Sequence, residues 1–100
     1  MKITLSPEVE EYLRNKHKEV IEVFVERTYY THMMESVAHT EIKYGAPKQA
    51  VQDQFTLFEV DGFKVYIANE LLDEKQDIFF HLDKFLGIKY LEVDGVRIHH

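Results

Sequence analysis

The sequence predicts an α+β fold that is mostly β, with one N-terminal helix and about seven short strands. Three observations indicate this class: a helix-start signal near the N-terminus, a recurring alternation of apolar and polar residues, and the dipeptide Asp61-Gly62 between two β-rich runs. One hundred residues suit one domain, which we expect to span residues 1–100.

The N-terminal helix is expected to follow a short β-prone run at Lys2–Leu5. Ser6 is a preferred N-cap residue, and Pro7 suits the first helical position because its missing N–H is not needed there. Val9, Tyr12 and Leu13 then fall on one face. We expect this helix to end near Lys18 and to bury that face.

The stretch Phe55–Asn69 is predicted to form a tight β-hairpin. Asp61-Gly62 tolerates the positive φ angles that a two-residue type I′ turn requires. In the second strand one face is wholly apolar, made by Phe63, Val65 and Ile67. A lone hairpin is marginally stable in water, so other strands or the helix must cover this face.

Alternation of apolar and polar residues predicts further strands, at 20–28 as a central strand, at 37–44, at 77–83, and again from 88 onward. Thr28–Ser36 and Gly45–Gln54 are expected to be loops, and Glu70–Gln76 to contain a helical turn. Around Asp94-Gly95 the segment Leu91–Ile98 repeats the residue pattern of the hairpin, which indicates a second hairpin.

Charge and composition exclude several classes of function. The formal net charge of −6 disfavours nonspecific binding to nucleic acid or to an anionic membrane. The chain has no cysteine, which excludes disulfides, cysteine-type zinc sites, a thiolate nucleophile and an all-cysteine iron–sulfur site. No apolar run approaches the roughly 20 residues of a transmembrane helix. We therefore expect a cytoplasmic protein that binds neither nucleic acid nor membranes.

Four segments, in order, resemble the HesB-like domains of A-type iron–sulfur cluster assembly proteins, and especially a short branch marked by adjacent cysteines. These segments are Met1–Glu8, Gly45–Lys48, Phe58–Tyr66 and Leu82–Lys89. The resemblance spans nearly the whole chain and implies a compact β-sandwich with one N-terminal helix. Each motif is weak alone, and it is their order and spacing that carry the resemblance.

The cysteines that this resemblance implies are missing. In that branch the cysteine pair follows the strand that here ends near Thr28, and Tyr29-Tyr30 stand in its place. Classical members also carry Cys-Gly-Cys near the C-terminus, where this chain has Val96–His100. Because iron–sulfur clusters need thiolate ligands, we expect the chain to be unable to carry a cluster in the family's way.

Imidazole and carboxylate groups near the missing cysteines suggest a metal site. His32 and His39, with Glu35 and Glu41, lie in or beside the expected loop, and Tyr29 or Tyr30 would add a phenolate. Such nitrogen and oxygen donors suit iron or zinc. The two histidines are seven residues apart, which matches no standard ligand spacing, so solvent-exposed histidines are the other interpretation.

The same segment also suggests an interaction surface. Tyr29, Tyr30, Met33 and Met34 combine apolar area with adaptable side chains, as is typical of protein interfaces. The alternative interpretation places one residue of each pair in the core.

Together these patterns predict a small, non-catalytic protein that binds a protein partner or a second copy of itself, with no cofactor expected. A cysteine-free iron or zinc protein using His32 and His39 is the first alternative. An enzyme of unknown type is the second alternative. It ranks last because the sequence has no phosphate loop and no recognisable catalytic triad signature.

Overall fold

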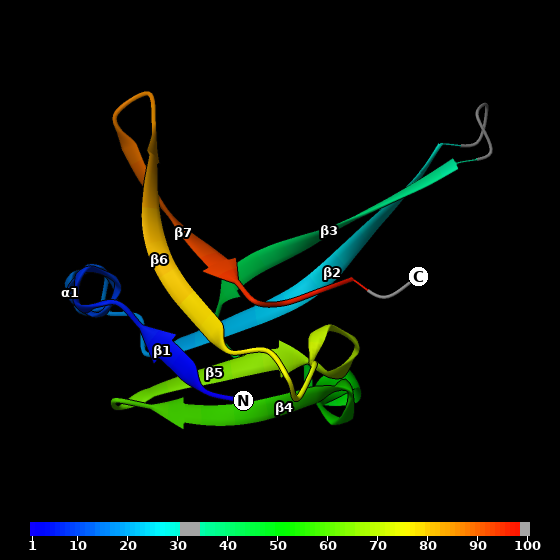
Figure 1. Cartoon of the computed structure of the whole chain (residues 1–100), viewed down its shortest axis with the longest axis horizontal. Coiled ribbons are helices and arrows are strands. Elements are labelled where there is room, and N and C mark those ends of the chain that lie inside the picture. Colours follow the sequence, from blue (N-terminus) through cyan, green and yellow to red (C-terminus); the bar gives the residue numbers. More distant parts are fainter. Residues whose placement is uncertain (31–34, 99–100) are drawn as a thin grey trace.

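The chain folds into two β-sheets and one α-helix, as the computed structural model shows (Figure 1). The structure describes residues 1–30 and 35–98, with the side chains of residues 29, 30, 35 and 36 left out. Within this part lie seven strands, one α-helix and two short 3₁₀ helices: β1 (Ile3–Leu5), α1 (Pro7–Asn15), β2 (Val20–Tyr30), β3 (Glu35–Tyr44), η1 (Gln49–Gln54), β4 (Phe55–Val60), β5 (Phe63–Ala68), η2 (Asn69–Leu71), β6 (Ile78–Phe85) and β7 (Ile88–Asp94). The predicted α+β, mostly β class is confirmed.

The strands form a three-stranded and a four-stranded sheet. In the smaller sheet the order is β1-β6-β7, with β1 parallel to β6 and β7 antiparallel to it. In the larger sheet the order is β3-β2-β5-β4, in which β2 pairs in parallel with β5 and antiparallel with β3. The strand from Val20 is therefore central, as the sequence predicts.

One hydrophobic core joins both sheets and the helix. Val9 and Leu13 of α1 are fully buried, as are Ile21 and Val23 of β2 and Phe80 of β6. The apolar face of β5 supplies the rest of the centre, from Phe63, Val65 and Ile67. The apolar face of β5 is thus buried against α1 and the smaller sheet.

The helix begins where the sequence predicts but ends earlier. Ser6 caps it, because its Oγ accepts a hydrogen bond from the backbone N–H of Val9 at 3.2 Å. Its C-terminus is a Schellman motif: the N–H of His17 donates to Arg14 O, and the N–H of Lys18 to Leu13 O. His17 adopts φ 56°, a left-handed conformation that an α-helix cannot continue, so the expected end near Lys18 is wrong.

The two Asp-Gly dipeptides have different structures. Asp61 and Gly62 both have positive φ, 51° and 86°, which confirms the predicted type I′ hairpin of β4 and β5. The hairpin predicted at Asp94-Gly95 is wrong. Strand β7 ends at Asp94. The hairpin that contains β7 is formed with β6, and its turn lies at Leu86-Gly87. Gly95 instead passes the backbone of Asp77 so closely that a Cβ would lie 2.0 Å from its carbonyl oxygen.

The β2–β3 hairpin is longer than the sequence predicts. Paired residues continue to Tyr30 and Glu35, so residues 28–30 and 35–36 belong to strands and not to a loop. Ladder hydrogen bonds join backbone groups, and they do not require the apolar alternation that the sequence lacks there. Together with β6–β7, this hairpin diverges from the body of the molecule (Figure 1).

Candidate metal site on the β2–β3 hairpin

Antiparallel pairing of β2 and β3 brings three ligand-type side chains onto one face. Glu26 lies directly opposite His39 in the ladder, and Phe24 lies opposite Glu41. Residues opposite one another in a sheet share a face, as do residues two apart on one strand. Glu26, His39 and Glu41 therefore form one cluster, although Glu26 comes from a different strand.

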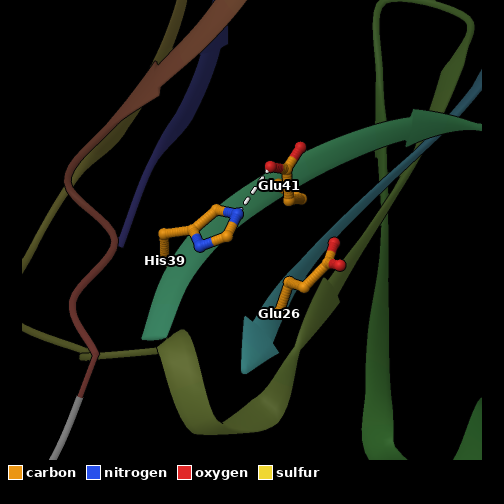
Figure 2. A group of neighbouring side chains, drawn as sticks. All are labelled: Glu26, His39 and Glu41. Carbon is orange, nitrogen blue, oxygen red and sulfur yellow. Dashed lines mark hydrogen bonds and ion pairs between the residues drawn. The ribbon is translucent and has the colours of Figure 1, made fainter. Parts of the chain in front are cut away.

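The donor atoms of this cluster lie close together. One ligand atom from each of Glu26, His39 and Glu41 lies within 4.8 Å of the other two. His39 and Glu41 point toward one another from β3, with Nε2 and Oε1 2.7 Å apart, while Glu26 approaches from β2 (Figure 2). The cluster is open to solvent rather than enclosed, because Glu26 and His39 are exposed and Glu41 is half-buried.

Electrostatics favour a cation at this cluster. Two carboxylates held this close repel each other, and a shared positive charge would relieve that repulsion. Glu41 Oε1 lies 2.7 Å from His39 Nε2, and this contact carries a positive charge only when the imidazole is protonated. A divalent ion would supply a larger one, and it would accept the imidazole lone pair as well as the carboxylate oxygens.

Two of the four predicted metal ligands lie together in the structure, and the side chains of the other two are not described. His39 and Glu41 come together as the sequence suggests. Glu35 stands four residues before His39 on β3, about 13 Å along the strand, and its side chain is outside the described part. His32 lies outside the described residues. The side chains of Tyr29 and Tyr30 are not described either, so a phenolate ligand from them stays a prediction.

Sequence reasoning missed Glu26. In the sequence Glu26 is only one of the residues that alternate with the apolar positions of a strand, next to Val25. Its partner becomes clear once the ladder is known, since Glu26 pairs with His39 and Tyr30 with Glu35. A search of antiparallel pairs between the two runs of residues 20–30 and 35–44 would have found it.

The predicted interaction surface falls outside what the structure describes of side chains. Met33 and Met34 are outside the described residues, and the side chains of Tyr29 and Tyr30 are not described either. A binding role for these four residues therefore stays a prediction.

His81 has a structural partner within its own hairpin. Its Nε2 lies 2.9 Å from Asp94 Oδ2 and 4.0 Å from Glu92 Oε2 across the β6–β7 ladder. The distance to Asp94 suits an ion pair, although the orientation does not make a hydrogen bond. The ring also stacks on Phe79, with centroids 5.9 Å apart. Carboxylates of β7 and the ring of Phe79 thus surround this histidine, whose buried Nε2 makes no hydrogen bond within the described residues.

Comparison with protein families identifies the group to which the chain belongs. The model of the CC/Se motif containing family matches residues 1–96. The chain belongs to that family. Its description names a CC/Se motif, and the chain has no cysteine, so a two-cysteine motif is absent from it. No curated protein and no solved structure matched the chain.

This membership corrects the predicted HesB-like resemblance. The matching family is the CC/Se motif containing family, and it covers the segments on which the resemblance was based. Those segments are mainly structural signals, such as the Ser6-Pro7 helix start and the Asp61-Gly62 turn. Capping residues and type I′ turns recur in unrelated proteins because backbone geometry demands them, so they identify local structure better than a family.

The described part of the chain has no helix that combines the length and the apolar composition needed to span a bilayer.

Proposed function

We propose that this chain is a small, non-catalytic binding protein that holds a divalent zinc or iron ion through Glu26, His39 and Glu41. The carrying observation is the convergence of one imidazole and two carboxylates, from two strands, within 4.8 Å. This ligand set replaces His32 and Glu35 of the sequence prediction with Glu26. A protein with this function needs no thiolate.

The spacing of the donors suits a single ion. Zinc binds imidazole nitrogen and carboxylate oxygen at about 2.1 Å, so two of its ligands lie no more than about 4.2 Å apart. The donors here lie within 4.8 Å of each other on exposed side chains. Small rotations about side-chain bonds would close that gap. Water would complete the coordination, because the cluster faces solvent.

The open position of the site supports binding rather than catalysis. Small-molecule active sites are usually concave and shield most of the substrate from water. Glu26, His39 and Glu41 instead lie on a strand face of a projecting hairpin (Figure 1, Figure 2). We also propose that the protein acts in the cytoplasm, which fractionation of cells that express it would test.

Calorimetric titration tests the metal site. Chelator-treated parent chain is titrated with zinc chloride, alongside His39→Ala and the control His17→Asn. Asn tolerates the left-handed conformation of His17, so the control removes an imidazole without disturbing the helix end. We expect one zinc ion per chain in the parent and in the control, and at least about tenfold weaker binding in His39→Ala.

Every chain in this comparison keeps His32, His99 and His100, so their contribution cancels. Equal zinc affinity in the parent and in His39→Ala would show that the ion binds elsewhere. A parent chain that binds no zinc and no iron(II) would remove the proposed function altogether.

A further inference from the structure

The β6–β7 hairpin carries an exposed apolar end. All residues from 83 to 90 are exposed, and we call this segment the arm. At its tip Phe85 is 67%, Leu86 87% and Ile88 71% exposed. Phe85 and Ile88 lie opposite one another, so the three side chains form one continuous apolar tip. Isolated two-stranded hairpins are marginal in water, which makes an uncovered arm of this kind unusual.

Leu86 is exposed to solvent, and it also occupies a strained backbone conformation. It occupies the first central position of the turn with φ 52°, followed by Gly87 with φ 81°. A turn with two positive φ angles favours Asn or Asp there, and a bulky residue is strained in that conformation. A solvent-exposed turn gains nothing from leucine. The residue makes physical sense where its side chain is buried by another molecule.

The whole chain exposes more surface than a monomer of its size. Its accessible surface is 7119 Å², whereas a folded monomer of 11.9 kDa exposes about 6,000 Å². Its radius of gyration is 14.4 Å, against about 13 Å for a compact chain of this length. Two diverging hairpins, β2–β3 and the β6–β7 hairpin that carries the arm, share this excess of about 1,100 Å², and a standard interface buries roughly 800 Å² of each partner.

Charges beside the arm favour a second copy as the partner. An open groove of about 590 Å³ separates the arm from α1, and its lining includes three acidic and three basic residues: Glu8, Glu11 and Asp83, with Lys16, Lys84 and Lys89. Within the described residues none of these six takes part in an ion pair. A symmetric contact requires a surface complementary to itself, and a balanced set of charges provides one.

We propose that the chain forms a symmetric dimer in which the arm of each copy is buried against the other copy. The apolar tips supply the contact area. Lys84 and Lys89 lie opposite one another at the base of the tip. In the proposed dimer they pair with the carboxylates of Glu8 and Glu11 of the second copy. This dimer lies on a different hairpin from the metal site and does not depend on it.

Light scattering coupled to size exclusion tests the dimer over a range of protein concentrations. The parent, Leu86→Asn and the control Leu57→Thr are compared. Asn suits the turn better than leucine, so Leu86→Asn keeps the fold while removing the most exposed apolar side chain of the tip. Leu57 is an exposed leucine on β4, and threonine retains its strand preference. We expect a dimer for the parent and for the control, and at least about tenfold weaker association for Leu86→Asn.

A second measurement tests the charge pairing. Lys84→Glu with Lys89→Glu should be monomeric alone, and should associate with a chain carrying Glu8→Lys and Glu11→Lys. Phe85→Thr is measured beside Leu86→Asn as a second tip variant, and it stands alone if Leu86→Asn loses its native circular dichroism. A parent chain that stays monomeric at high micromolar concentration would overturn the proposal, and so would a dimer unaffected by both tip variants. Binding of the monomer to anionic vesicles would identify a membrane as the partner instead.

Discussion

Glu26 lies directly opposite His39 in the ladder that joins β2 to β3. This register, rather than proximity along the chain, places a carboxylate of one strand beside the imidazole of the next. A shift by one residue would turn either side chain to the other face of the sheet. The candidate metal site therefore depends on correct pairing of the longest hairpin in the molecule.

Gly95→Ala is expected to destabilise the fold much more than Gly45→Ala. Both glycines have positive φ, 92° and 101°, so both substitutions incur the left-handed cost of about 1–2 kcal/mol. Only at Gly95 would the new Cβ meet the carbonyl oxygen of Asp77, whereas Gly45 has open space. Crowding should add about 1–3 kcal/mol, measured as the difference in free energy of unfolding by urea. Equal losses in the two variants would show that the contact with Asp77 is absent.

Phe80→Ala is expected to cost about 3–5 kcal/mol of stability, because the side chain is fully buried where β6 meets the core. Its neighbour Phe79 provides the matched control. That ring is 42% exposed on the opposite face and contacts His81, so Phe79→Ala should cost less than about 1 kcal/mol. Urea denaturation of both variants measures the difference. Similar losses would mean that β6 faces the core in a different register.

Stability should fall between pH 10 and pH 12 in part through Tyr44. Burial and a hydrogen bond shared with Tyr12 raise the pKa of Tyr44 to about 12, from an ordinary value of about 10. A raised pKa means that the folded state holds the proton more tightly, so this stabilisation is complete below pH 10 and is lost as the pH approaches 12. Tyr44→Phe should show a shallower decline in thermal unfolding temperature over this range than the parent. Parallel declines would contradict the raised pKa.

Local signals in the sequence predicted much of the fold. Asp61-Gly62 identified the β4–β5 hairpin because few other residues tolerate its two positive φ angles. Ser6 and Pro7 identified the start of α1, since capping depends on adjacent residues alone. The apolar alternation of β5 likewise identified its buried face, from Phe63 to Ile67.

Features that depend on distant contacts were not predictable. Asp94-Gly95 has the sequence of a turn, but Gly95 serves a close approach to Asp77, eighteen positions earlier. The helix ends before His17 through backbone hydrogen bonds, and a histidine side chain does not predict such an end. Glu26 joins the candidate site only through pairing across the hairpin. Periodicity identifies the face of a strand and gives no information on which residue lies opposite.

The most direct measurement compares zinc binding by Glu26→Gln and His32→Ala, because these two residues distinguish the ligand set in the structure from the set in the sequence prediction. Gln keeps the size of Glu26 and removes its charge. Glu26→Gln is expected to weaken zinc binding at least about tenfold, with His32→Ala equal to the parent. The reverse result, strong binding by Glu26→Gln and weak binding by His32→Ala, would contradict a site formed by Glu26, His39 and Glu41.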